Sequence, residues 1–77
     1  MPDYLMKQLT EVTFCAHDEN ETSLQFVRFQ RLDGSIERQS WVLCDKRGLS
    51  IDFDTLTVAI VNMSILTQTD INDFTIL

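Results

Sequence analysis

Residues 24–44, which read LQFVRFQRLDGSIERQSWVLC, constrain the fold more than any other stretch of the chain. Two apolar-rich runs flank the dipeptide Asp33-Gly34, and both residue types tolerate the positive φ that a tight two-residue turn requires. The same stretch holds the only Trp and three of the four Arg. It predicts a β-hairpin around which the rest of a small domain must pack.

The register of this hairpin follows from its side-chain pairs. A two-residue loop sets Phe26 opposite Trp41, an aromatic pair that stabilises neighbouring strands. A three-residue loop that adds Leu32 shifts the pairing by one position, loses that pair and sets Arg28 opposite Arg38, where like charges repel. We therefore predict the two-residue loop.

Both faces of the predicted hairpin carry apolar side chains. One face includes Leu24, Phe26, Trp41 and Leu43. The other includes Val27, Phe29, Ile36 and Val42. A sheet that is apolar on both sides requires cover on both, from a helix, another sheet or a partner chain.

The hairpin is flanked by weaker signals. Pro and Asp near the N-terminus favour a short helix over residues 2–9, and alternating apolar side chains then predict a strand over about 10–17. After the hairpin, alternation predicts a short strand over 49–53. The last residues, 74–77, predict an edge strand.

Residues 54–66 are ambiguous between helix and strand. Asp54 is a good N-cap, and five apolar residues fall on one helical face: Leu56, Ala59, Ile60, Met63 and Leu66. Many β-branched residues in the same segment favour a strand instead. We predict a single α+β domain over residues 1–77, with a three- or four-stranded antiparallel meander packed against this one helix; an all-β fold is the alternative.

The net charge of −6 is unevenly distributed. Residues 28–47 carry five bases and three acids, whereas residues 48–77 carry four acids and no base. Acidic segments on both sides of a mildly basic centre favour a partner protein with a basic surface. The acidic residues expected to bind it are Asp18, Glu19, Glu21, Asp52, Asp70 and Asp73.

The sequence lacks the patterns that carry common enzyme chemistry. It has only two Gly, which excludes a glycine-rich phosphate loop, and only two Cys, which are not in a CxxC pair. Cys15, His17 and Cys44 could form a small metal or redox site, although zinc sites normally combine two close ligand pairs. No cofactor, signal peptide or membrane-spanning segment is expected, which predicts a cytoplasmic protein.

We therefore expect a non-enzymatic protein-interaction module, acting as an inhibitor or adaptor. A nucleic-acid binder is the alternative, because aromatic and basic side chains interleaved on a sheet can hold single strands. Its residues would be Phe26, Arg28, Arg31, Arg38, Trp41, Lys46 and Arg47. A homodimer is a further expectation, with the strand over 74–77 near the interface because no Lys or Pro blunts its edge.

Overall fold

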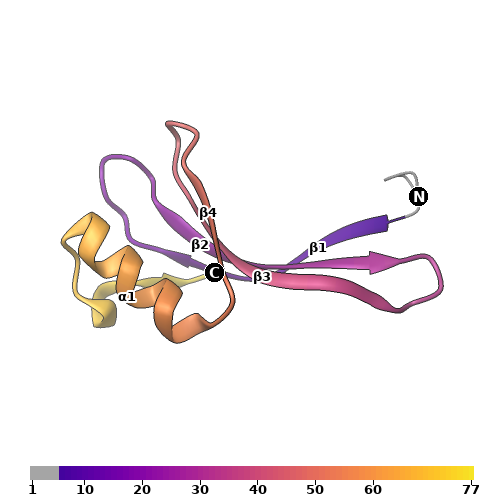
Figure 1. Cartoon of the computed structure of the whole chain (residues 1–77). Coiled ribbons are helices and arrows are strands. Elements are labelled where there is room, and N and C mark those ends of the chain that lie inside the picture. Colours follow the sequence, from indigo (N-terminus) through magenta and orange to yellow (C-terminus); the bar gives the residue numbers. More distant parts are fainter. Residues whose placement is uncertain (1–5) are drawn as a thin grey trace.

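A computed structural model describes residues 6–77. Five antiparallel strands form one sheet in the order β4-β3-β2-β1-β5, and one helix packs against one of its faces (Figure 1). The strands are β1 (Met6–Cys15), β2 (Ser23–Arg31), β3 (Ile36–Cys44), β4 (Ser50–Phe53) and β5 (Thr75–Ile76). The helix is α1 (Leu56–Thr67), followed by a short 3₁₀ turn, η2 (Ile71–Asp73). The predicted α+β meander with one C-terminal helix is confirmed, and β5 adds a fifth strand beside β1.

The hairpin between β2 and β3 keeps the predicted register around Phe26 but not the predicted turn. Phe26 lies opposite Trp41, as expected. The loop, however, has three residues: Gly34 N–H donates to the carbonyl of Arg31 at 3.0 Å, and only Gly34 (φ 91°) has a positive φ there. A bulge near Glu37 then restores the register. The prediction of a two-residue loop was wrong because a bulge can absorb the extra residue without any slip in the strands beyond it.

This bulge also changes the face on which one apolar side chain lies. Ile36 is paired with Gln30, two positions along β2 from Arg28. Alternation in β2 therefore places Ile36 on the side of the sheet that carries Leu24 and Phe26, not on the opposite side as predicted.

The turn gives a first testable prediction. Gly34→Val should lower the free energy of unfolding by about 1 kcal/mol or more, because a β-branched residue resists positive φ. A Cβ at this position would meet only the side-chain nitrogen Nε2 of Gln30, at 3.9 Å, so the cost is conformational and not steric. Urea unfolding measures it, with Gly34→Asn as the milder control because Asn tolerates this conformation. Equal midpoints for Gly34→Val and the wild type would contradict the assigned turn.

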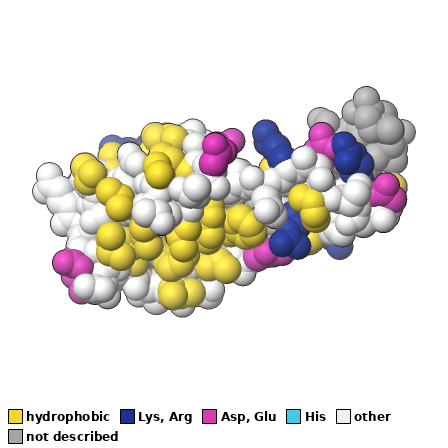
Figure 2. Space-filling model, turned by 60° about the horizontal axis from the view of Figure 1, so that its bottom comes forward, with side chains coloured by type: hydrophobic (Ala, Val, Ile, Leu, Met, Phe, Trp, Pro, Cys, Tyr) yellow, Lys and Arg dark blue, Asp and Glu magenta, His cyan; other side chains and the backbone are white. Residues whose placement is uncertain are grey.

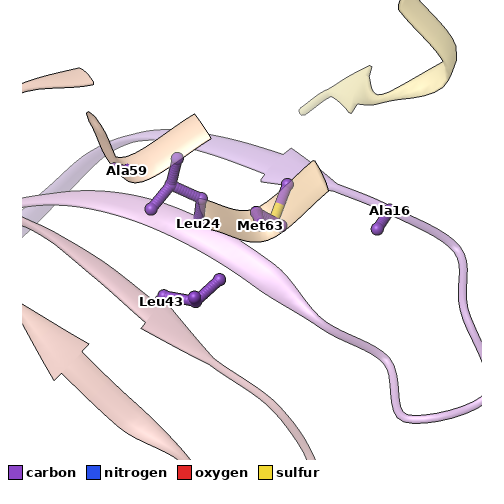
Figure 3. Close-up of a cluster of buried hydrophobic side chains, with 5 residues drawn as sticks. All are labelled: Ala16, Leu24, Leu43, Ala59 and Met63. Carbon is purple, nitrogen blue, oxygen red and sulfur yellow. The ribbon is translucent and has the colours of Figure 1, made fainter. Parts of the chain in front are cut away.

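Helix α1 forms despite its β-branched residues because the sheet covers its inner side. Thr55, and not the predicted Asp54, is the N-cap: its hydroxyl accepts a hydrogen bond from Val58 N–H at 3.4 Å. The fully buried Ala59 and Met63 of α1 lie over Leu24 and Leu43 of the sheet (Figure 3). Leu66, predicted on this inner face, is instead 48% exposed.

The N-terminal prediction was wrong where it can be compared. Residues 1–5, including most of the helix predicted over 2–9, lie outside the described residues. Met6 to Thr10 belong to β1 and pair with β2, from Arg31 back to Val27. A long partner strand supplies hydrogen bonds and side-chain contacts that a marginal short helix lacks.

The molecule is elongated because the sheet is longer than the helix that covers it. Its extents are 40 × 23 × 19 Å, and its radius of gyration is 13.6 Å. A compact domain of this length has a radius of gyration of about 11.5 Å. The ends of β1, β2 and β3 beyond α1, residues 6–11 and 28–39, project as a bare three-stranded arm (Figure 1).

Candidate interaction surface

The side of α1 that faces away from the sheet carries exposed apolar side chains. Val58, Val61 and Ile65 follow each other at helical spacing and are 52%, 42% and 72% exposed. Leu66, three residues after the buried Met63, is exposed at the flank of the helix. We call these four residues the α1 stripe. Large apolar patches that water reaches commonly mark protein-binding surfaces. A helix that is apolar on both sides belongs between two layers, and the sheet supplies only one of them.

The stripe is uncharged, whereas its two ends are acidic. Residues 55–69 contain no charged side chain. Asp52 and Asp54 precede this run, and Asp70 and Asp73 follow it; all four are exposed. An apolar centre with a charged rim is the usual composition of a protein interface. Hydrophobic side chains gather over the half of the molecule that holds α1, and most Lys and Arg visible in that view lie over the arm (Figure 2).

The other predicted acidic residues lie in the turn between β1 and β2. Glu19 and Glu21 are exposed there, and Asp18 is half-buried. This turn touches the turn between β3 and β4, because Lys46 N–H donates to the carbonyl of Asn20 at 3.0 Å. The predicted acidic residues thus come from the β1–β2 turn, from β4 and from the segment after α1, all within the part of the chain outside the arm.

Asp18 has a structural role within its turn. Its two carboxylate oxygens accept hydrogen bonds from the hydroxyl and the backbone N–H of Thr22, each at 2.7 Å. Burial raises the pKa of Asp18, but these hydrogen bonds outweigh it and hold the pKa below its usual value.

The lowered pKa of Asp18 predicts a pH dependence of stability. A carboxylate with a lowered pKa stabilises the fold above its unfolded-state pKa, and this contribution is lost as the pH falls through the folded-state pKa. Asp18→Asn should therefore reduce stability at neutral pH and flatten the loss of stability in acid. Thr22→Val, which removes one of the two hydrogen bonds, should give part of that effect. Urea unfolding between neutral and acidic pH measures both, and an acid limb unchanged in Asp18→Asn would contradict the role.

The residues named for nucleic-acid binding are divided among separate places. The rings of Trp41 and Phe26 are in tilted contact, with centroids 4.7 Å apart, on the face of the sheet against which α1 packs. Three of the four Arg form ion pairs: Arg28 with Glu11, Arg31 with Glu37 and Arg47 with Asp45. Lys46 and Arg47 lie in the β3–β4 turn, at the opposite end of the sheet from the arm.

The fourth arginine makes the one aromatic contact of a basic side chain among the described residues. The guanidinium of Arg38 lies over the ring of Phe29, 4.6 Å from its centroid. Both side chains lie on the open face of the sheet, where they border a hollow of about 290 Å³ together with Gln8, Gln25 and Ser40.

Cys15 and Cys44 are both free thiols, on strands that flank β2. Each lies opposite Ser23, so two strand spacings, about 10 Å in all, separate their Cα atoms, which is too far for a disulfide. His17 Nε2 lies 2.8 Å from Thr75 Oγ1 and joins the end of β1 to β5. Cys15 and His17 border a hollow of about 370 Å³ at the β1–β2 turn, but within residues 6–77 no three acidic, His or Cys side chains are placed to hold a metal ion.

The α1 stripe is the surface that sequence reasoning missed. The periodicity of residues 54–66 predicts one apolar helical face, and the β-branched residues around the helix make a second face hard to recognise in the sequence. The uncharged run from 55 to 69 was the available signal.

None of the helices in the described part of the chain is long and apolar enough to span a membrane. No protein-family model, curated protein or solved structure matches the chain.

Proposed function

We propose that this chain is a non-enzymatic protein-interaction module that binds a partner protein through the α1 stripe. The observation that carries the proposal is the exposure of Val58, Val61 and Ile65 on the outer side of α1, with Leu66 exposed at its flank. Burying such side chains against a partner is favourable by about 25 cal/mol for each Å² of apolar surface removed from water. A small module of this kind acts as an inhibitor or an adaptor, because its effect comes from the surface that it covers.

The acidic rim defines the chemistry of the partner. Asp52 and Asp54 at one end of α1, and Asp70 and Asp73 at the other, favour an apolar surface bordered by Lys or Arg. Opposite charges at a rim steer association and exclude partners of like charge, although each adds little affinity. The partner that fits is therefore a protein with a basic-edged apolar groove.

A matched pair of variants tests this proposal. Ile65 in the stripe and Leu32 at the hairpin tip are 72% and 75% exposed, so the substitution of either by Glu leaves the core intact. Immobilised wild type, Ile65→Glu and Leu32→Glu are compared by quantitative mass spectrometry of proteins captured from the source cell. We expect specific partners on the wild type and Leu32→Glu, with at least tenfold depletion on Ile65→Glu, as for a hot-spot residue.

Two results would contradict the proposal. One is equal recovery on Ile65→Glu and the wild type, and the other is loss of recovery on Leu32→Glu alone. The second result would move the binding surface to the hairpin tip.

Binding of single-stranded nucleic acid is a second candidate, supported by the contact between Arg38 and Phe29 on the open sheet face. An Arg stacked on an aromatic ring can extend that platform to a base. Fluorescence anisotropy with labelled single-stranded oligonucleotides tests it. Binding that Arg38→Ala abolishes would support this candidate, and no binding at low salt would remove it.

A further inference from the structure

We propose that, without its partner, the chain forms a two-fold dimer in which the arm of each copy lies against the α1 stripe of the other. This inference rests on the proposed function, because it assigns the same stripe a second occupant. The arm shares two features expected of the partner, since it carries Leu9 and Ile36 beside Lys7 and has a net charge of +1. Dimer formation would then keep the stripe covered until the partner competes for it.

The arm exposes part of the sheet face on which α1 packs, and we call this exposed part the step. The helix covers one end of the sheet face, and the arm leaves the rest of that face bare (Figure 1). The register places Leu9 opposite Arg28, and Lys7 and Ile36 opposite Gln30, so these side chains share the face on which α1 packs. Ile36 is 43% exposed. The part of β1 in the arm, residues 6–11, is about 20 Å long, similar to the length of about 18 Å of a 12-residue helix.

Charge favours this pairing of unlike surfaces. Residues 6–11 and 28–39, which make up the arm, carry four bases and three acids. Residues 12–27 and 40–77 carry two bases and eight acids. The arm is thus net +1 and the remaining described part is net −6. On the step itself, Lys7 and Arg28 outnumber Glu11, which pairs with Arg28. A second copy that lays its stripe on the step brings its acidic rim to these bases.

Pairing of two α1 stripes would bring like charges together. In an antiparallel pair of helices, Asp54 of each copy would meet Asp70 and Asp73 of the other. In a parallel pair, acids would meet the same acids. Either arrangement places like charges at both ends of the contact, which is unfavourable in a protein of net charge −6. The arm, with its net charge of +1, avoids this repulsion.

The extended shape supplies the reason for the chain to associate. Six apolar side chains are buried among the described residues, which is a small core for one domain. Small folds often complete their cores by association. A stable interface covers about 800 Å² on each partner, more than one four-residue stripe offers. Two-fold symmetry doubles the contact, because each chain contributes both its stripe and its step.

Complementation between two charge variants tests the arrangement. Ile36→Glu adds an acid to the step, which then faces the acidic rim of a second copy. Ile65→Lys adds a base to the stripe, which then faces a basic arm. In a dimer of either variant alone, both arm–stripe contacts contain the unfavourable charge. A mixture keeps one unaltered contact, and its second contact pairs Glu with Lys. Circular dichroism checks that both variants fold.

Sedimentation equilibrium from micromolar to near-millimolar concentration provides the readout. We expect the wild type to pass from 8.9 kDa to about twice that mass. Each variant should dimerise at least tenfold more weakly, as for a hot-spot residue, and an equimolar mixture should recover most of the loss. Added salt should weaken the wild-type dimer, because it screens opposite charges; it would strengthen a dimer held by paired stripes.

The possible failures are distinguishable. A wild type that stays at 8.9 kDa overturns the dimer, as does a mixture that recovers nothing. If Ile65→Glu still loses captured partners in either case, the proposed function stands. If the dimer forms and complements while capture is insensitive to Ile65→Glu, the dimer stands and the proposed function fails. If neither measurement responds to Ile65, the stripe is not an interaction surface and both proposals fall.

Discussion

Leu24→Ala is expected to lower the free energy of unfolding by about 3–4 kcal/mol, the range for a buried Leu whose cavity cannot collapse. Leu24 is fully buried between the sheet and α1, in one cluster with Leu43 and Met63 (Figure 3). Each neighbour is held by its own strand or helix, so the space left by the missing carbons stays open. Urea unfolding followed by circular dichroism measures the loss.

Leu32→Ala is the matched control for this substitution, because Leu32 is 75% exposed at the hairpin tip. It should change the free energy of unfolding by less than about 0.5 kcal/mol. Equal effects at the two positions would mean that the helix does not pack on the sheet as described.

Trp41→Ala is the second large effect, with an expected loss of about 3 kcal/mol or more. The Trp41 ring is half-buried and lies near two aromatic rings, with its centroid 4.7 Å from that of Phe26 and 6.0 Å from that of Phe14. Its loss removes both ring contacts together with the cover that it gives the core beside α1. A small domain has about 5 kcal/mol of stability, so this variant should be largely unfolded at moderate temperature.

Trp41→Phe separates packing from the indole itself. It keeps an aromatic ring next to Phe14 and Phe26 and should recover more than half of the loss. Thermal unfolding by circular dichroism compares the three proteins, since the alanine and phenylalanine variants lack the tryptophan signal. A Trp41→Ala protein with an unchanged midpoint would show that the ring is exposed and available for binding.

The features that sequence reasoning predicted are those with strong local causes. The turn residues Asp33 and Gly34 and the pairing of Phe26 with Trp41 locate the hairpin, and apolar residues at helical spacing from Leu56 to Met63 locate the inner side of α1. The three-residue loop was not predicted because, without a bulge, it would set Arg28 opposite Arg38. The bulge near Glu37 avoids that pairing. The first half of β1 was missed because its strand pairing depends on residues more than 15 positions away in the chain.

The candidate surface was less accessible to sequence reasoning than the fold. The acidic residues were visible as charges, but the rim they form around α1 depends on how β4 and η2 meet the two ends of the helix. The pairing of Phe26 with Trp41 was predictable, but the packing of Trp41 against the core beside α1 was not visible in local patterns. Whether one side or both sides of an apolar helix are covered depends on which other elements pack against it, which local patterns do not encode.

The central claim is that the outer face of α1 binds a partner protein. Amide ¹H–¹⁵N spectra of the labelled chain, recorded while the captured partner is titrated, test it most directly. We predict that the largest shifts lie at Val58, Val61 and Ile65 and at the acids that flank α1, with little change in the β1–β2 turn. Shifts confined to the open face of the sheet, around Phe29 and Arg38, would contradict the account.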